Sequence, residues 1–228
     1  METFMKTAVL EEPGRFRLID TPAPAKPGPG EALVRVLTVG ICGTDLHAFE
    51  GTQPFFTYPR ILGHELAVEV LDIGDSVTGF RPGDRCAVNP YMTCGVCAAC
   101  SRGRTNCCAK MRVIGVHSDG GMCDRIVLPA AQMYRCDKLP NEMIPLVETL
   151  GVGIQAAGRG AVQSRGRAIV VGSGPIGLEF ATRRYGLRRY YPSHAEARQE
   201  PASMLVFDCT GDRDSMESSI DLLEQGGN

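Results

Sequence analysis

Four cysteines lie within one short segment and could together hold a metal ion. They are Cys94, Cys97, Cys100 and Cys108, in the pattern C-x2-C-x2-C-x7-C. Zinc accepts four thiolates in a tetrahedron, and such a closed site leaves no coordination position for a substrate. The pattern therefore predicts a structural zinc bound by a loop. Cys107 is the neighbouring alternative to Cys108, but the spacing favours Cys108.

A second set of potential metal ligands lies upstream and is chemically mixed. Cys42 is followed, further along the chain, by the triplet Gly63-His64-Glu65. Sulfur, nitrogen and oxygen ligands from separate segments are typical of a catalytic zinc, which keeps one position free and polarises a bound alcohol as a Lewis acid. Taken alone, Cys42 could equally be a buried cysteine without a ligand role. The combined set predicts a catalytic zinc site.

A glycine-rich turn could bind the phosphates of a dinucleotide. Its residues are Gly172, Gly174, Pro175, Ile176 and Gly177, in the pattern G-x-G-x-x-G. An apolar strand is expected before this turn, at 167–171, and a helix after it, at 178–185. Strand, glycine turn and helix together are typical of a nicotinamide-cofactor site, here for NAD or NADP.

The segment after this turn departs from a complete cofactor domain. An acidic residue at the end of a second strand, about 20 residues later, normally binds the ribose. Residues 187–201 have no strand pattern and include Pro192, so this acid has no assigned position. A strand is expected at 204–210 and a helix at 215–223. The cofactor domain is therefore predicted to be incomplete.

The elements that must position the metal ligands are predicted to be strands. Segments 31–39 and 64–73 alternate apolar and polar residues and end at glycine, and a shorter strand is expected at 85–88. Such alternation is typical of half-buried antiparallel strands. From about residue 145 the pattern changes, and 146–160 is expected to be a helix.

The motifs together resemble those of the zinc-dependent medium-chain alcohol dehydrogenases, on the polyol, sugar-acid and threonine dehydrogenase branch. The matching segments are 40–47, 63–65, 94–108, 115–121 and 145–148. The resemblance implies a mixed α and β fold. A GroES-like β-rich catalytic domain, residues 1–150, would precede an incomplete Rossmann domain, residues 151–228.

The resemblance also assigns roles to residues around the catalytic zinc. It implies that Cys42, His64 and Glu65 are ligands, and that Glu148 is an alternate fourth ligand. Thr44 and His47 resemble a proton relay from the alcohol to solvent. Asp45 could hydrogen-bond the free ring nitrogen of His64. The simpler alternatives are that Thr44 and Asp45 only cap a helix and that Glu148 is a surface carboxylate.

Composition favours an ordinary globular protein. The chain has 228 residues, of which 43% are hydrophobic and 22% charged, with a formal net charge of -2. We expect no nucleic-acid partner and no membrane span, because the charge is not basic and no apolar run is long enough. Ten cysteines without a signal-peptide pattern favour metal binding in the cytoplasm over disulfides. A homo-oligomer is possible.

Two functions of different class remain. The first is an oxidoreductase that transfers a hydride from a secondary alcohol, a small molecule, to NAD(P)+. The alternative is a catalytically inactive zinc-binding remnant of the same family, whose shortened cofactor half cannot hold the dinucleotide. A relative similar to the quinone reductases, without zinc, is a third option, but it would have no use for either ligand set.

Overall fold

A computed structural model of the chain describes residues 3–160, 168–172, 205–210 and 213–222. The chain divides into two compact units, Met1–Glu148 and Thr149–Asn228. Each unit is described by itself below. The assignment of a catalytic and a cofactor-binding role to residues 1–150 and 151–228 stays a prediction.

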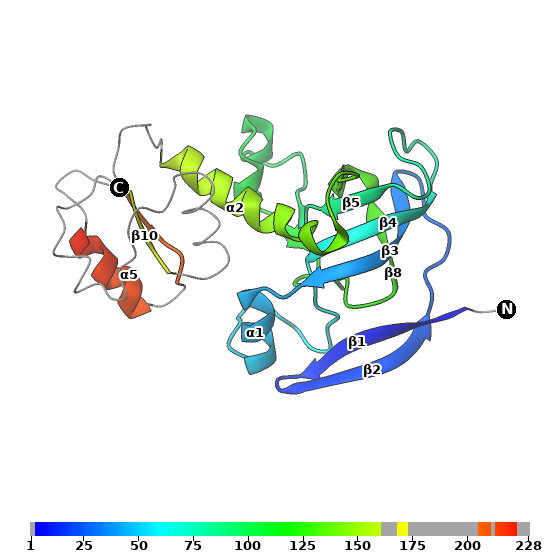
Figure 1. Ribbon diagram of the computed structural model, residues 1–228, viewed down its shortest axis with the longest axis horizontal. Coiled ribbons are helices and arrows are strands. Elements are labelled where there is room, and N and C mark those ends of the chain that lie inside the picture. Colours follow the sequence, from blue (N-terminus) through cyan, green and yellow to red (C-terminus); the bar gives the residue numbers. More distant parts are fainter. Residues whose placement is uncertain (1–2, 161–167, 173–204, 211–212, 223–228) are drawn as a thin grey trace. The chain divides into compact units, whose positions relative to one another are not determined.

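A five-stranded antiparallel sheet forms the centre of the first unit (Figure 1). In spatial order its strands are β8 (Arg125–Pro129), β3 (Glu31–Gly40), β4 (Glu65–Ile73), β5 (Arg85–Val88) and β9 (Met133–Arg135). The strands expected from alternation at 31–39, 64–73 and 85–88 are present and pair antiparallel.

Side chains from alternate strand positions bury the core of this sheet. Val34, Leu66, Val68, Val70 and Leu128 are at most 2% exposed. Because successive side chains of a strand point to opposite faces, one face of β3 and β4 supplies most of this apolar cluster. The sheet is thereby fixed as a rigid platform for the loops at its ends.

A hairpin and a helix pack beside the sheet in the same unit. The hairpin pairs β1 (Phe4–Glu12) with β2 (Arg15–Pro22), and the helix α1 spans Gly43–Glu50. A separate apolar cluster that includes Leu10, Ala48 and Leu62 joins these elements. It anchors α1, which begins directly after Cys42.

The cysteine-rich segment forms a lobe between two very short strands. Strands β6 (Tyr91–Met92) and β7 (Arg112–Val113) pair antiparallel at its base. Two turns of 3-10 helix, η1 (Cys100–Arg102) and η2 (Thr105–Cys107), lie within it. Two further such turns, η3 (Ala130–Gln132) and η4 (Asn141–Met143), precede helix α2 (Leu146–Arg159), which agrees closely with the helix expected at 146–160.

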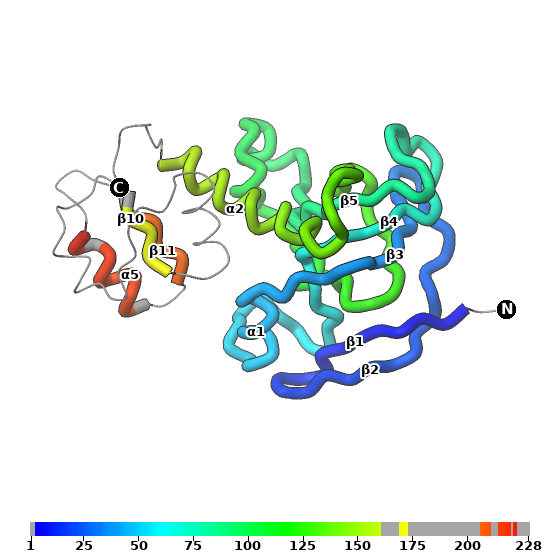
Figure 2. The backbone as a smooth tube through the Cα atoms, viewed as in Figure 1, coloured from blue at the N-terminus to red at the C-terminus, as the bar shows by residue number. Residues whose placement is uncertain are grey.

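The described part of the second unit contains a parallel strand pair. Strand β10 (Ala168–Val171) pairs in parallel with β11 (Leu205–Asp208), as Figure 2 shows. Helix α5 (Arg213–Ser219) and the 3-10 turn η6 (Ile220–Leu222) follow, where a single helix at 215–223 was expected. The helix expected at 178–185 lies outside the described residues. No helix among the described residues is long and apolar enough to cross a membrane.

Candidate functional site

The structure brings the mixed ligand set together. One ligand atom each of Cys42, His64 and Glu65 lies within 4.8 Å of the others. Cys42 follows strand β3 and His64 directly precedes β4, whose first residue is Glu65. Because Gly40 pairs with Glu65 in the antiparallel register, the end of β3 and the start of β4 lie side by side. Residues more than 20 positions apart thus meet at one sheet edge.

Glycines make room for this arrangement. A side chain on Gly40 would overlap that of Glu65, with its Cβ only 2.8 Å from the Glu65 Cβ. Gly63 adopts a positive φ of 95° directly before His64, and its carbonyl accepts a hydrogen bond from Gly121 N–H at 2.9 Å. A Cβ on Gly115 would lie 2.7 Å from that carbonyl oxygen. The 115–121 segment therefore packs directly behind His64, a role that its glycines alone did not reveal.

Asp45 lies between two of the ligands and is only 3% exposed. Its Oδ2 accepts a hydrogen bond of 2.9 Å from the backbone N–H of Cys42. Its Oδ1 lies 3.7 Å from His64 Nδ1, which is longer than a hydrogen bond, and both of these buried atoms lack a hydrogen-bond partner. Asp45 therefore fixes the Cys42 backbone and faces His64 electrostatically, so its expected bond to the ring stays a prediction.

The electrostatics of this cluster are those of one base among several acids. Burial disfavours a charged imidazole, but a hydrogen bond with Cys42 and the negative charge of Asp45 outweigh it and raise the pKa of His64 to about 9. Burial, together with the nearby Glu148 carboxylate, raises the pKa of Glu65. A divalent cation would relieve this excess of acidic groups. The orphaned His64 and Asp45 atoms and the S, N, O donor set fit zinc with an open position.

Glu148 lies near the three ligands without belonging to their group. It is half-buried in the first turn of α2, and its charge contributes to the raised pKa values of both His64 and Glu65. Its place as an alternate fourth ligand stays a prediction. Burial and the negative charge of Glu148 raise the pKa of Tyr91, a residue near this cluster that sequence reasoning missed. The only signal for Tyr91 was its position three residues before Cys94.

The two relay residues lie on α1. Thr44 and His47 are three positions apart and therefore share one helix face. His47 is exposed, with Nδ1 3.3 Å from Thr52 Oγ1 and 3.5 Å from Glu50 Oε2. An exposed histidine can exchange protons with solvent. The relay from Thr44 to His47 remains a prediction.

The four predicted thiols also come together. Ligand atoms of Cys94, Cys97, Cys100 and Cys108 lie within 4.8 Å of one another. A tetrahedral zinc with Zn–S bonds of about 2.3 Å places sulfurs roughly 3.8 Å apart, so small shifts would complete the site. Cys107 lies outside this group, and its thiol accepts a 3.5 Å contact from the neighbouring Asn106 amide.

Backbone amides already support thiolates in this lobe. Cys108 Sγ accepts N–H contacts from Cys94 at 3.3 Å and Lys110 at 3.4 Å, and these bonds lower the pKa of Cys108. Backbone N–H groups of Cys100 and Ala109 likewise lower the pKa of Cys97 to about 6.

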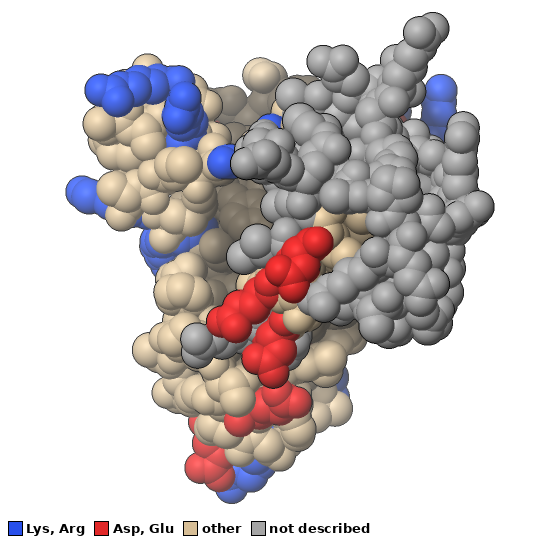
Figure 3. Space-filling view, turned by 90° about the vertical axis from the view of Figure 1, so that its left-hand side faces the viewer, with Lys and Arg blue, Asp and Glu red and all other residues tan. Residues whose placement is uncertain are grey.

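The lobe also carries positive charge that would offset four thiolates. Its exposed cations are Arg102, Arg104, Lys110 and Arg112, and residues 85–118 contain no Asp or Glu. On the face in Figure 3, several Lys and Arg side chains gather at the upper left, and others lie at the right edge and the lower end. Zinc bound by four thiolates keeps a net negative charge, so these cations would stabilise the loaded lobe.

Gly172 is the one residue of the predicted dinucleotide turn that the structure describes. It follows β10 with φ of 100°, and a Cβ there would lie 3.0 Å from the carbonyl carbon of Cys209, so only glycine fits without displacement. Gly174, Pro175, Ile176 and Gly177 lie outside the described residues.

Asp208 ends β11 beside Gly172, but hydrogen bonds occupy both of its oxygens. Oδ1 accepts from Thr210 N at 2.9 Å and from Thr210 Oγ1 at 2.6 Å. Oδ2 accepts from the hydroxyls of Ser219 at 2.9 Å and Ser215 at 3.2 Å. Asp208 therefore bonds to Thr210 directly after β11 and to two serines of α5, and it is not a free carboxylate for a ribose.

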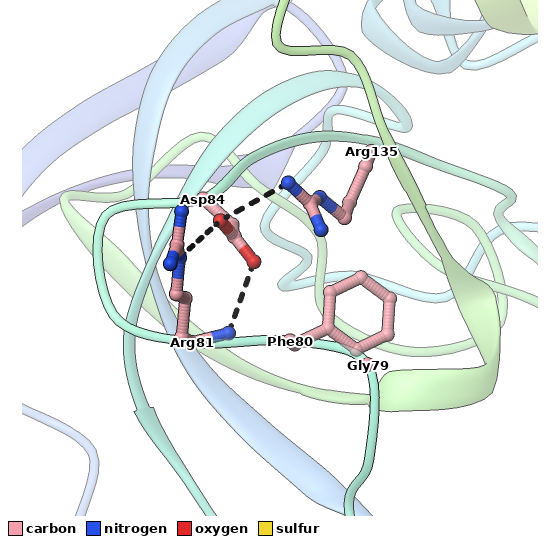
Figure 4. A pocket seen from close by; sticks show the side chains of 5 residues that line it. All are labelled: Gly79, Phe80, Arg81, Asp84 and Arg135. Atoms are coloured by element: carbon pink, nitrogen blue, oxygen red, sulfur yellow. Dashed lines mark hydrogen bonds and ion pairs between the residues drawn. The ribbon is translucent and has the colours of Figure 1, made fainter.

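A surface pocket of about 340 Å³ lies elsewhere on the first unit (Figure 4). Its lining residues are Gly79, Phe80, Arg81, Asp84 and Arg135. The buried Asp84 accepts a hydrogen bond from Arg81 N at 3.0 Å and lies 3.5 Å from Arg81 Nε and 3.7 Å from Arg135 Nη2. These charges are satisfied within the protein, so the pocket is explained as a braced turn.

An antiparallel β unit with one closed thiol set and one open mixed set defines a class of protein: a zinc-dependent dehydrogenase. The comparisons with known proteins agree. Residues 28–141 match the family described as the alcohol dehydrogenase GroES-like domain. The L-galactonate-5-dehydrogenase of Escherichia coli K12 is 36% identical over 88% of this chain and 68% of its own length.

Solved structures give the same result. An alcohol dehydrogenase of E. coli CFT073 complexed with NADH superposes with a TM-score of 0.85 at 25% identity, covering 99% of this chain and 75% of the other. A thermostable alcohol dehydrogenase of Pyrobaculum aerophilum with bound cobalt and zinc gives 0.87 at 26% identity, with the same coverage. The chain therefore belongs to the zinc-dependent medium-chain alcohol dehydrogenase family, and the predicted fold class is confirmed. It spans between 68% and 51% of the lengths of the first curated relatives that it matches.

Proposed function

We propose that the chain is a zinc-dependent oxidoreductase that transfers a hydride from a secondary alcohol to NAD(P)+. The reaction would convert the alcohol to a ketone, reduce the nicotinamide and release one proton. The L-galactonate-5-dehydrogenase relative supports a sugar acid as the alcohol, and polyols or threonine-like alcohols belong to the same class. The single observation that carries the proposal is the convergence of Cys42, His64 and Glu65 at one sheet edge.

Each residue of the mixed site has a separate task in this proposal. Cys42, His64 and Glu65 hold the metal, and Glu148 serves as an alternate ligand, which the effect of its charge on the pKa of Glu65 supports. When bound, zinc supplies the Lewis acidity that polarises the alcohol. Thr44 accepts the alcohol proton and His47 passes it to solvent, for which the exposure of His47 is suited. A second zinc at the four thiols stabilises the lobe.

In this proposal residues 1–150 are the catalytic domain and residues 151–228 bind NAD or NADP. Gly172 and the following glycines would allow the pyrophosphate to approach the backbone. The cytoplasmic location and a homo-oligomeric state belong to the same proposal and are not required by the chemistry.

The rival function, a zinc-binding remnant without hydride transfer, also has an observation in its favour. Asp208 has no free oxygen to offer a ribose, although it ends the strand next to Gly172. In a dinucleotide-binding sheet, a carboxylate at the end of a strand near the glycine turn normally takes that role. This remnant would bind two zinc ions but no dinucleotide.

Calorimetric titration of zinc-loaded, monodisperse protein with NADH and NADPH distinguishes the two functions. We expect saturable binding of one of the two nucleotides, which would also identify the preferred cofactor. Oxidation of polyols and sugar acids would then be followed by the absorbance of the reduced nicotinamide. A folded chain with two zinc ions that binds neither nucleotide would contradict the dehydrogenase proposal and support the remnant.

A further inference from the structure

We propose that Thr52 and Glu50 are positioning residues of the proton relay: they hold the proton of neutral His47 on Nδ1 and leave Nε2 to accept the proton of the alcohol. This inference rests on the proposed function, because it gives the relay of that function a defined starting state. A neutral imidazole carries one proton, and the partner of one ring nitrogen decides which nitrogen carries it. Only the nitrogen without the proton can act as a base.

The end of helix α1 brings residue 52 back beside His47. Gly51 has a positive φ of 76°, and its N–H donates to the Ala48 carbonyl at 3.2 Å. The N–H of Thr52 donates to the His47 carbonyl at 3.0 Å. These two bonds are those of a Schellman motif, in which the second residue beyond the helix packs on its last turn. That contact is commonly apolar, whereas here it joins a hydroxyl and an imidazole.

The turn of the β1–β2 hairpin holds this helix end in place. The N–H of Gly14 donates to the Phe49 carbonyl at 2.7 Å. A Cβ on Gly51 would lie only 2.8 Å from Pro13 Cγ, so the hairpin turn packs directly against the residue that ends the helix. Backbone contacts therefore determine where the side chain of Thr52 begins.

The Thr52 hydroxyl determines which nitrogen of His47 carries the proton. Its Oγ1 lies 3.3 Å from His47 Nδ1 and donates to the His47 carbonyl, also at 3.3 Å. A hydroxyl has a single proton, so an Oγ1 that donates to the carbonyl meets the ring with a lone pair. It then accepts a hydrogen bond from Nδ1–H. With the proton on Nε2 instead, the hydroxyl would have to abandon the carbonyl in order to donate to Nδ1.

Glu50 favours the same tautomer. Its Oε2 lies 3.5 Å from His47 Nδ1, which is longer than an ordinary hydrogen bond, and both side chains are more than half exposed. An ionised carboxylate offers only lone pairs, which attract an N–H and repel an unprotonated ring nitrogen. Because solvent screens this exposed pair, Glu50 contributes less than Thr52.

The free lone pair of His47 is then on Nε2. This nitrogen takes one proton and the ring becomes imidazolium. Release of the same proton to solvent, for which the ring is exposed, restores the neutral Nδ1–H form. Each turnover thus ends in the tautomer from which the next begins.

The test determines the tautomer of His47 by long-range ¹H–¹⁵N spectra of the zinc-loaded full chain, at a pH where the ring is neutral. The chain has four histidines, and His47→Gln assigns the signal. In the wild type we expect Nδ1–H to be the major form. Thr52→Val should lower the ratio of Nδ1–H to Nε2–H by about 5-fold, the equivalent of one hydrogen bond, and Thr52→Ser, which keeps the hydroxyl, should retain the wild-type ratio. Glu50→Gln should lower the ratio by a smaller factor.

Thr57→Val is the matched control, because the Thr57 hydroxyl accepts from Arg60 Nη2 at 2.8 Å. It should leave the His47 ratio unchanged. A wild-type ring mainly in the Nε2–H form, or equal ratios in Thr52→Val and Thr57→Val, would overturn the positioning role and leave the proposed function intact. A chain with the Nδ1–H ring that binds neither NADH nor NADPH would instead overturn the proposed function and the relay with it, while the hydrogen bond at His47 would stand.

Discussion

His64 is the only base in a cluster of acids, and its charge state is central to the mixed site. In the metal-free chain, burial disfavours the protonated imidazole, but a hydrogen bond with Cys42 and the negative charge of Asp45 outweigh burial and raise the pKa of His64 to about 9. A metal needs the neutral imidazole as a ligand, so it must displace this proton. Charge balance at the site is therefore supplied by a proton or by a metal ion.

The raised pKa of His64 predicts that the stability of the metal-free protein depends on pH. The folded pKa of His64, about 9, lies above its ordinary value of 6.5. The stabilisation from its protonation is therefore fully present below pH 6.5 and is lost as the pH rises through about 9. Denaturant unfolding of chelator-treated protein should show a loss on the order of 3 kcal/mol across this window. The loss should be absent in His64→Gln. An equal decrease in the free energy of unfolding with pH in the two proteins would contradict this prediction.

Asp45 is expected to control the affinity of the mixed site for zinc. Asp45→Asn removes the charge that faces His64 while it preserves the shape of the side chain. We expect zinc affinity at this site to fall about 10- to 100-fold, with the four-thiol zinc retained, as measured by chelator competition. Asp20→Asn is the matched control, because Asp20 is exposed and pairs with Lys6 on the hairpin. Equal affinity in both variants would show that Asp45 only caps α1.

At the level of secondary-structure elements, strand ends and tight loops position the predicted metal ligands. The register of β3 on β4 aligns Gly40 with Glu65, and the loop with Gly115 packs against the backbone before His64. In the lobe, the β6–β7 pair closes the thiol loop. These elements place the ligands through backbone geometry, and glycines occur where two backbones approach closely.

The packing of Gly115 can be tested against a glycine of the same conformation. Gly115 and Gly14 both have φ of 78°, but a Cβ on Gly115 would contact the Gly63 carbonyl, whereas nothing lies within 4 Å of one on Gly14. Gly14→Ala should cost about 1 kcal/mol from the positive φ alone. Gly115→Ala should cost about 2 kcal/mol more and weaken zinc at the mixed site. Thermal unfolding and zinc content measure both, and equal costs would contradict the close packing.

Substitutions of two adjacent cysteines test which thiols bind the predicted zinc of the lobe. Cys108→Ser removes a member of the four-thiol group and should release its zinc, whereas Cys107→Ser should retain it. Metal content after dialysis and the protease sensitivity of the lobe give the result. A loss of zinc in Cys107→Ser instead would show that the two thiols exchange roles.

At the scale of the whole molecule, the chain consists of two compact units joined within helix α2. Both predicted metal sites lie in the first unit, and the described strands of the second unit pair in parallel. Metal binding and the stability of the second unit should therefore respond to different substitutions.

Asp208→Asn tests this separation. An amide can replace only part of the acceptor capacity that Thr210, Ser215 and Ser219 now use. Hydrogen exchange of the β10 and β11 amides should accelerate by an amount equivalent to about 1–3 kcal/mol, while zinc content stays at the wild-type value. Asp214→Asn, exposed on α5, should change exchange by less than about 1 kcal/mol. A loss of zinc in Asp208→Asn would show that the units are coupled.

The sequence by itself determined the features that depend on short separations. The thiols from Cys94 to Cys108 lie within one loop, so their spacing already implies a common metal. Alternation along 31–39 and 64–73 likewise predicted strands that the structure contains, because a strand exposes opposite faces to core and solvent at every second residue. The family followed from the same local motifs.

Only the tertiary structure decided how distant segments meet. The register of β3 on β4 brings Cys42 to within 4.8 Å of His64 and Glu65, and a lone pattern of residue types contains no information on that register. The influence of Glu148 on Tyr91 and the occupied oxygens of Asp208 were equally invisible in the sequence. Such contacts depend on how strands and helices pack after the chain has folded, which single-sequence periodicity does not encode.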